Sequence, residues 1–183
     1  YKHSFLKDLK KGISSVRAGN VIGGGDWSKD RLIPDILRSF EEGKKLSIRN
    51  PDAIRPWQYV LDPLSGYLML AQNLHDDYVN FSSPFNFGPE VQESKSVRWI
   101  VENMSNYWPG SEWEINENNT LAEAKLLTLN ADKAKNLLNW SPKINIEKSL
   151  QHIFNWHMTF KTDPKNISEF SLKEIEEYEA KME

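Results

Sequence analysis

The sequence contains no cysteine and no long apolar run. The missing thiols exclude disulfide bonds, zinc sites with thiolate ligands and a cysteine nucleophile. No apolar stretch approaches the roughly 20 residues that a membrane-spanning helix needs. The opening segment YKHSFLKDLKKG also lacks the apolar centre of a signal peptide. We therefore expect no membrane partner and a cytoplasmic location.

Positive charge is not in excess either. The 23 Lys and Arg residues against 26 Asp and Glu residues give a formal net charge of -3 at pH 7, which argues against nucleic acid as a partner. The seven tryptophans are therefore interpreted as core or domain-contact residues rather than as base-stacking platforms. A chain of 183 residues is long enough to bury a core in one domain or one and a half.

Several catalytic and cofactor motifs are also missing. His152 and His157 are five residues apart, which does not align them on one helix face, so no metal site is expected. No G-x-S-x-G turn presents a serine nucleophile. No G-x-G-x-x-G joins a strand to a helix, as a dinucleotide-binding loop would.

What the sequence does contain is an alternation of strand-like and helix-like segments. Strands are expected within 13–22, 45–51, 55–60, 83–90, 112–116 and 125–130. Helices are expected over 31–43, 61–74, 97–108, 131–140, 144–160 and 168–183, and residues 1–11 resemble the last turns of a helix, which suggests truncation. The order predicts an α/β fold, and the helix-rich second half indicates a sheet that is not completed here.

Local signals refine three of these helices. Asp30 stands before the helix over 31–43, where a start signal is expected. Asn139 is suited to left-handed backbone at the end of its helix. The last helix is expected to dock loosely or to face a partner, because it combines an acidic, solvated face with a weak apolar stripe. The acidic face consists of Glu174, Glu176, Glu177 and Glu179, and the stripe of Phe170, Leu172, Ile175 and Tyr178.

The stretch RAGNVIGGGDW joins a short buried strand to three glycines. The apolar residues of the strand are Ile13, Val16, Val21 and Ile22. Near its end, Asn20 and the backbone N–H groups of residues 23–25 would lie close together, which suits phosphate oxygens. A flexible turn explains three consecutive glycines equally well, and both interpretations stay open.

The stretch LSIRNPDAIRPWQYV places two arginines on either side of a turn. Arg49 precedes the turn, and Arg55 follows it, next to Pro56 and Trp57. An arginine between rigid neighbours is pre-organised to bind phosphate, and a charge-assisted hydrogen bond contributes roughly 1.5–3 kcal/mol. The alternative is a salt bridge or packing of Arg55 on the Trp57 ring.

Taken in order and spacing, these segments resemble the CDP-glucose 4,6-dehydratases, an NAD-dependent branch of the extended short-chain dehydrogenase/reductases. The segments that carry the resemblance are RAGNVIGGGDW, DRLIPDILRSF, SIRNPDAIRPWQYVLDPLSGYLMLA, FNFGP and NADKAKNLLNWSP. The IRPWQ segment separates this branch from the dTDP-glucose dehydratases, which carry an aspartate after the arginine. The resemblance covers about residues 1–157.

The resemblance implies an α/β fold in which the end of a Rossmann-type parallel sheet meets the smaller, helix-rich substrate-binding domain of an extended short-chain dehydrogenase/reductase. Residues 1–25 and 57–90 would belong to the NAD-binding domain. Residues 26–56 and 91–160 would form the sugar-nucleotide-binding domain, and residues 161–183 a C-terminal acidic helix. Strands that lack neighbours would expose edges and apolar surface, so self-association of the chain alone is expected.

The resemblance also implies a set of substrate-binding residues. They are Asn20, Arg31, Leu32, Ile33, Arg49, Arg55 and Asn86. Asn20 and Arg55 would hold the diphosphate, and the guanidinium plane of Arg49 would stack on the base. The segment 31–33 would lie along the nucleotide, partly through backbone groups, with Asn86 as a second asparagine nearby.

The chain departs from the family at two positions. Ala122 stands where a histidine is usual, and Asn139 replaces a glycine that asparagine can mimic in left-handed backbone. The NAD loop, the dehydrating residues and the Tyr-x-x-x-Lys pair of the family would all lie upstream. Tyr1 and Lys2 are adjacent and are not that pair, so no catalytic residue is expected in this chain.

The implied activity of the intact protein is the NAD-dependent conversion of CDP-glucose to CDP-4-keto-6-deoxyglucose and water. We expect a homo-oligomer, a dimer, when intact. This chain would supply the part that binds the CDP-sugar and would be inactive alone. Two alternatives stay open: a non-catalytic sugar-nucleotide-binding or regulatory module, and an epimerase or reductase acting on another sugar nucleotide.

Overall fold

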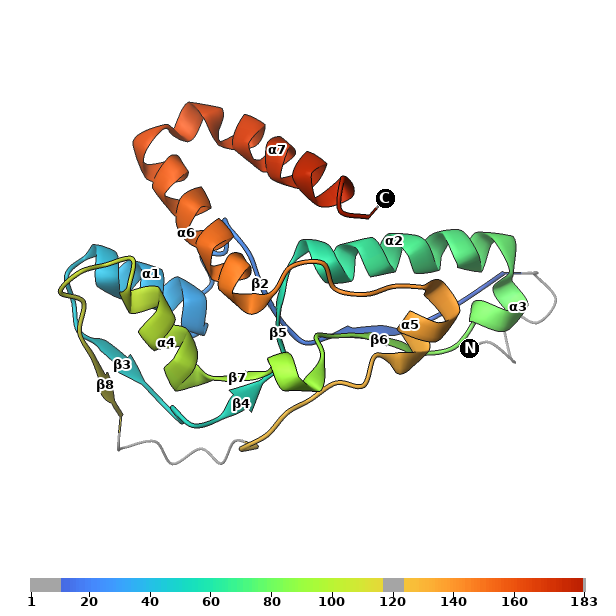
Figure 1. Ribbon diagram of the computed structural model, residues 1–183, viewed down its shortest axis with the longest axis horizontal. Coiled ribbons are helices and arrows are strands. Elements are labelled where there is room, and N and C mark those ends of the chain that lie inside the picture. The colour runs from blue at the N-terminus through green and yellow to red at the C-terminus, as the bar shows by residue number, and fades with distance from the viewer. Residues whose placement is uncertain (1–10, 117–123, 183) are drawn as a thin grey trace.

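The computed structural model describes residues 11–116 and 124–182 of the chain (Figure 1). Its strands are β1 (Val16–Ala18), β2 (Asn20–Ile22), β3 (Leu46–Ile48), β4 (Ile54–Arg55), β5 (Trp57–Tyr59), β6 (Phe85–Phe87), β7 (Lys95–Ser96) and β8 (Trp113–Ile115). Its α-helices are α1 (Leu32–Glu41), α2 (Leu61–Asp76), α3 (Tyr78–Phe81), α4 (Val97–Ser105), α5 (Asp132–Leu138), α6 (Ile146–Thr162) and α7 (Ile167–Glu179). Residues 1–10, with the expected helix end, and Ala122 lie outside the described residues.

The strands pair two by two. The pairs β1–β6, β2–β5 and β3–β8 are parallel, and β4–β7 is antiparallel. Parallel pairs need crossover connections, which here contain helices. The expected α/β fold is therefore confirmed.

The strand expected within 13–22 is divided at Gly19. Before Gly19 the chain pairs with β6, and after it the chain pairs with β5. A Cβ atom at position 19 would lie 2.2 Å from the carbonyl oxygen of Pro56, so glycine is required for this close approach. The expectation that the whole strand is buried is wrong, because Val16 of β1 is 40% exposed.

Two hydrophobic clusters occupy the two ends of the molecule in Figure 1. The cluster around α1, α4 and β3 includes Ile33, Ile36, Leu37, Phe40, Leu46, Ile48, Ile100, Met104 and, from α6, Leu150 and Ile153. The cluster around α2, α5 and β6 includes Leu70, Phe85, Phe87, Ala134, Leu138 and Trp140. The apolar face expected for the first helix is thus buried, and β2 and β5 contribute Ile22 and Trp57 to the first cluster.

Three expected element boundaries need correction. Helix α1 begins at Leu32 with Arg31 as its N-cap, while Asp30 has left-handed backbone with φ of 60°. Helix α4 ends at Ser105, because the next three residues continue as tight turns. The strand expected over 125–130 is reduced to one bridge between Ile54 and Leu126, while Ile54 and Arg55 also pair with β7.

The end of α5 follows the sequence expectation. Asn139 is the C-cap with left-handed backbone at φ of 52°. Trp140 next to it is 2% exposed and packs edge-on against Phe87 at 5.1 Å between ring centroids. The left-handed turn therefore directs the tryptophan into the core.

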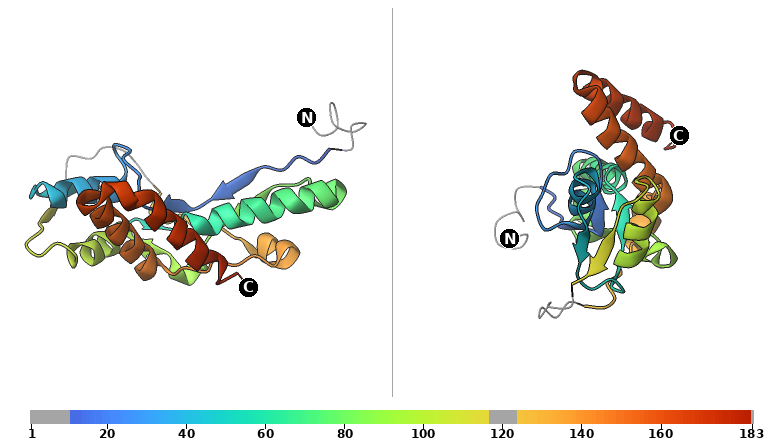
Figure 2. Two further views of the ribbon diagram at one scale, coloured as in Figure 1. Left: turned by 90° about the horizontal axis from the view of Figure 1, so that it is seen from above. Right: turned by 90° about the vertical axis from the view of Figure 1, so that its left-hand side faces the viewer.

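The C-terminal helix is docked more firmly than expected. Helices α6 and α7 pack against each other and lie along one side of the molecule (Figure 2). The carboxylate of Glu174 is 11% exposed and lies 2.7 Å from Nδ1 of His152, so this member of the acidic run is not solvated. Tyr178 is 4% exposed, whereas Leu172 and Ile175 of the expected stripe face outward.

Candidate functional site

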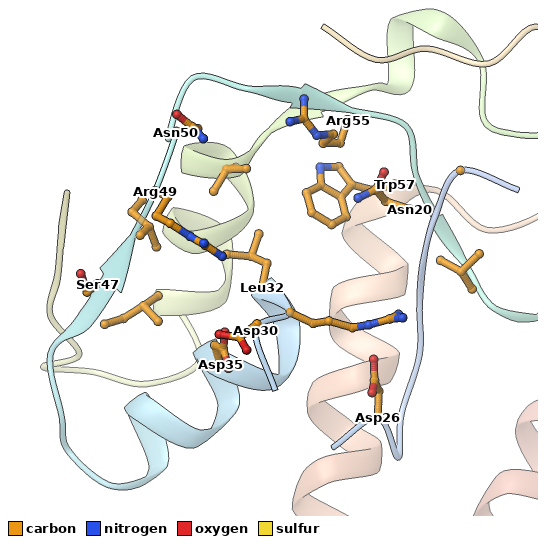
Figure 3. A pocket seen from close by; sticks show the side chains of 16 residues that line it. Asn20, Asp26, Asp30, Leu32, Asp35, Ser47, Arg49, Asn50, Arg55 and Trp57 are labelled. Carbon is orange, nitrogen blue, oxygen red and sulfur yellow. The ribbon is translucent and has the colours of Figure 1, made fainter. Parts of the chain in front are cut away.

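A cavity of about 540 Å³ opens between β2, the start of α1, β3 and the β4–β5 segment (Figure 3). Its lining residues are Gly19, Asn20, Val21, Asp26, Asp30, Arg31, Leu32, Asp35, Leu46, Ser47, Ile48, Arg49, Asn50, Arg55, Trp57 and Val97. The cavity contains five of the seven residues that the resemblance proposed, namely Asn20, Arg31, Leu32, Arg49 and Arg55. Segments separated by up to 78 positions in the sequence thus meet around one space.

One wall is formed by the first residues of two parallel strands. Asn20 begins β2 and is in register with Trp57 of β5. The backbone N–H of Asn20 donates to the carbonyl of Pro56 at 2.8 Å. The indole Nε1 of Trp57 donates to the carbonyl of Lys95 at 3.0 Å, which fixes the ring whose face borders the cavity. Asn20 is thus placed by backbone pairing, with its side chain left for a ligand.

The N-terminus of α1 forms the opposite wall. Arg31 is the N-cap residue with extended backbone, and no side chain caps the helix. The first N–H groups of a helix have no partner within it, and together with the helix dipole they favour an anion. Leu32 and the exposed Arg31 both line the cavity. This end of α1 therefore combines a fixed guanidinium charge with backbone donors.

Arg49 and Asn50 come from the turn that follows β3. Arg49 is exposed and its guanidinium extends into the cavity toward Leu32 (Figure 3). Asn50 has φ of 41°, and its amide nitrogen is buried without a hydrogen-bond partner in the described structure. A buried donor without an acceptor is costly, so this amide suits an acceptor atom of a ligand. Sequence reasoning noted the turn but did not propose Asn50.

Arg55 closes the cavity at β4. Its Nη1 donates to the carbonyls of Ile54 at 3.0 Å and Ala124 at 2.8 Å. These bonds fix the guanidinium at the cavity edge, and its planar fork has the geometry that suits phosphate oxygens.

Carboxylates balance the guanidinium groups around the cavity. Asp26, Asp30 and Asp35 all line it (Figure 3). Burial acts to raise the pKa of Asp26, but hydrogen bonds from Ser28 and the charges of Arg31 and Arg38 lower it below its usual value. An ionised carboxylate accepts hydrogen bonds from hydroxyl groups. The sequence reasoning missed all three aspartates, because only the fold brings them to one surface.

Two of the proposed residues lie outside this cavity. Ile33 is 3% exposed and packs in the core around α1. Asn86 lies in β6, where its amide nitrogen donates to the carbonyl of Asn130 at 3.2 Å. Its side-chain oxygen is buried without a partner in the described structure. The structure therefore separates Ile33 and Asn86 from the other five.

The glycines at 23–25 do not line the cavity either. A Cβ atom at Gly24 would lie 2.3 Å from Cγ of Trp156, and Gly25 approaches the same ring. Gly23 approaches Val60 instead, so these glycines serve close packing in the described structure and form no part of the cavity wall. This loop does not provide the dinucleotide-binding turn that NAD needs, and the described residues do not fit that cofactor by themselves.

The described ranges, 11–116 and 124–182, contain neither a metal-binding cluster nor a bilayer-spanning helix. No group of three or more His, Cys, Asp or Glu side chains is arranged to hold a metal ion. No helix in these ranges has the length and apolar character required to cross a bilayer.

Sequence comparisons relate the chain to sugar-nucleotide dehydratases. A profile of the family described as GDP-mannose 4,6 dehydratase matches residues 24–153. The CDP-glucose 4,6-dehydratase of Salmonella typhimurium is 50% identical over 147 residues, which are 80% of this chain and 41% of that protein. The chain thus spans about two fifths of the length of this curated relative.

Solved structures share the fold. The dTDP-glucose 4,6-dehydratase of Bacillus anthracis, in complex with NAD, matches 90% of this chain and 49% of its own with a TM-score of 0.68 and 23% identity. The UDP-glucuronic acid 4-epimerase of Bacillus cereus, in complex with UDP-glucuronic acid and NAD, matches 86% of this chain and 49% of its own chain. The TM-score is 0.69 and the identity 19%. At these identities the likeness concerns the fold alone, and it agrees with the Rossmann-type α/β architecture expected from the sequence.

Proposed function

Since the chain belongs to the GDP-mannose 4,6 dehydratase family, we propose that it forms the nucleotide-sugar-binding part of an NAD-dependent CDP-glucose 4,6-dehydratase. The observation that carries the proposal is the cavity in which three arginines and Asn20 meet the open N-terminus of α1. The 50% identity to a CDP-glucose 4,6-dehydratase supports the choice of the nucleotide and the sugar.

The cavity offers a separate partner for each part of a CDP-sugar. Arg55, Asn20 and the N-terminus of α1 would hold the diphosphate, because guanidinium forks and free backbone N–H groups suit phosphate oxygens. Arg49 would stack on the cytosine ring. Asp26, which stays ionised, would accept hydrogen bonds from sugar hydroxyls. These contacts would hold the glucose in a fixed position while residues outside this chain carry out the reaction in the intact enzyme.

The proposed reaction of the intact enzyme removes water from CDP-glucose and leaves CDP-4-keto-6-deoxyglucose. The described residues do not fit NAD, so no hydride or proton transfer is assigned to them. We propose that the chain alone binds substrate without turning it over. We also propose, on the resemblance, that the intact enzyme acts in the cytoplasm as a homodimer, and that Ile33 and Asn86 support the site from its periphery.

The proposal is tested by measuring CDP-glucose binding by calorimetry, with GDP-mannose and UDP-glucuronic acid as competitors. We expect CDP-glucose to bind most tightly. We expect Arg49→Met to weaken binding about three- to thirtyfold, the range that corresponds to loss of a cation–π contact. Because Arg49 is exposed and has no hydrogen bond or ion pair to another described residue, the substitution should leave folding unchanged.

Lys44→Met is the matched control, since it removes an exposed positive charge outside this cavity. It should bind CDP-glucose as the wild type does. Tighter binding of another sugar nucleotide would favour the epimerase or reductase alternative. Binding by the intact protein without formation of a 4-keto sugar in the presence of NAD would favour the non-catalytic module.

A further inference from the structure

One wall of the cavity is a loop without regular structure. The loop spans residues 23–31, and it presents Asp26, Asp30 and Arg31 to the cavity. Asp30 has left-handed backbone with φ of 60°, which a non-glycine residue adopts only where its surroundings fix it. Arg31 follows directly as the N-cap of α1. The direction of the Arg31 side chain therefore depends on what holds this loop.

Arg38 holds the loop from helix α1. Its Nη1 donates to the carbonyl of Trp27 at 3.2 Å, and its Nη2 donates to the carbonyl of Ser28 at 3.3 Å. The same guanidinium is ion-paired with Asp35, one turn earlier on α1. Arg38 does not line the cavity itself. It binds the loop at Trp27 and Ser28, which lie in the sequence between Asp26 and Asp30.

The opposite side of the loop packs on helix α6. The ring of Trp27 lies 5.2 Å from that of Phe160 and 6.2 Å from that of Trp156, measured between centroids. The indole nitrogen of Trp156 donates to the hydroxyl of Ser171 at 2.9 Å, which fixes the ring. The loop is thus held by aromatic packing on one side and by hydrogen bonds from Arg38 on the other.

We infer that Arg38 is a positioning residue that fixes the 23–31 loop so that Arg31 and Asp26 meet the nucleotide sugar. The inference rests on the function proposed above. A planar guanidinium can serve two carbonyls and a carboxylate at once, whereas the ammonium group of lysine is a point charge without that fork. Arg38→Lys therefore keeps the positive charge and the ion pair with Asp35 but loses the hydrogen bonds to the carbonyls of Trp27 and Ser28.

The test compares Arg38→Lys with Arg98→Lys in the intact protein. The two arginine side chains are 35% and 36% exposed, and each pairs with one aspartate. Arg98 donates to Asp52 and stacks on Trp113, and no hydrogen bond joins it to the 23–31 loop in the described structure. Two readouts are needed: the Kd for CDP-glucose, and hydrogen exchange of the amides in the loop without ligand.

We expect Arg38→Lys to speed exchange within the loop and to weaken CDP-glucose binding on the order of tenfold, while Arg98→Lys changes neither. Unchanged loop exchange in Arg38→Lys overturns the inference, as does unchanged binding. A wild-type protein that fails to bind CDP-glucose overturns the proposed function. In that case the ligand-free exchange experiment separately reports whether Arg38 fixes the loop.

Discussion

Gly24 lies against the ring of Trp156, where a side chain of any size would collide with it. The ring cannot easily move, because its nitrogen is bonded to Ser171 and its face stacks on Phe160 at 5.5 Å. Gly24 needs no positive φ, so crowding alone makes glycine necessary here. The contact connects α6 to the loop that leads into the cavity.

Gly24→Ala is expected to lower the free energy of unfolding by about 1–3 kcal/mol, the usual cost of overpacking. Urea unfolding measures this change. Gly43→Ala is the matched control, because Gly43 has nothing within 4 Å of a new Cβ atom but has φ of 63°. That variant should lose only about 1 kcal/mol, from backbone strain. If Gly24→Ala lowers the free energy of unfolding no more than Gly43→Ala does, crowding by Trp156 is not what requires glycine at position 24.

At the scale of elements, a buried polar network joins α7 to α2. The carboxylate of Asp62, which is fully buried, accepts hydrogen bonds from the hydroxyl of Tyr178 at 2.8 Å and from the backbone N–H of Lys143 at 2.7 Å. The indole of Trp140 donates to the backbone carbonyl of Asp62 at 3.0 Å. Three distant segments therefore meet at the start of α2.

This network makes stability depend on pH. Burial raises the pKa of Asp62 above its ordinary value of 3.8, despite the hydrogen bonds that lower it. The folded protein therefore keeps this proton to a higher pH than the unfolded chain does, and burying the ionised carboxylate becomes costly as the pH rises. Asp62→Asn removes this charge. Its unfolding free energy should improve relative to the wild type as the pH increases from 4 to 7, in urea titrations at each pH.

For Asp77→Asn, the difference in unfolding free energy from the wild type is expected to change with pH in the opposite direction. Hydrogen bonds from Asn80 lower the pKa of Asp77, so its contribution is present at neutral pH and is lost on acidification. Asp77→Asn should therefore lose stability relative to the wild type as the pH rises.

The Asp62 prediction has its own contradicting outcome. If the difference in unfolding free energy between Asp62→Asn and the wild type does not change with pH, Asp62 is not a buried carboxyl group that ionises at a raised pKa.

At the scale of the molecule, apolar side chains of β1 and α2 face outward. Val16 is 40% exposed, and Leu64 and Leu68, one turn apart on α2, are 45% and 73% exposed. Within the described residues β1 pairs on one side only, with β6. An open strand edge beside exposed apolar residues favours association with another chain.

The chain studied alone should therefore self-associate in a concentration-dependent way, as measured by sedimentation velocity. Leu68→Lys should shift the equilibrium toward monomer, because it places a charge on the exposed face of α2. Leu137→Lys is the control, because Leu137 is also exposed, at 52%, but lies on α5 instead of on the exposed face of α2. A chain that stays monomeric at all concentrations would contradict this expectation.

The sequence by itself determined the features that depend on neighbouring residues. The alternation of strands and helices, the buried face of α1 and the left-handed Asn139 all follow from local periodicity and backbone preference. The resemblance also selected Arg31, Arg49 and Arg55, which the fold brings to one cavity, because their sequence spacing is that of a related family.

Only the tertiary structure decided which polar groups would meet. The sequence placed Glu174 on a solvated face, but the fold pairs it with His152. Gly24 and Gly25 pack against Trp156, which lies more than a hundred positions away in the sequence. The same holds for Asp62 and Tyr178, which are 116 residues apart. Such contacts depend on how whole elements pack, and no local pattern in a single sequence specifies them, since the free energy that selects them comes from burial and hydrogen bonding between segments that are distant along the chain.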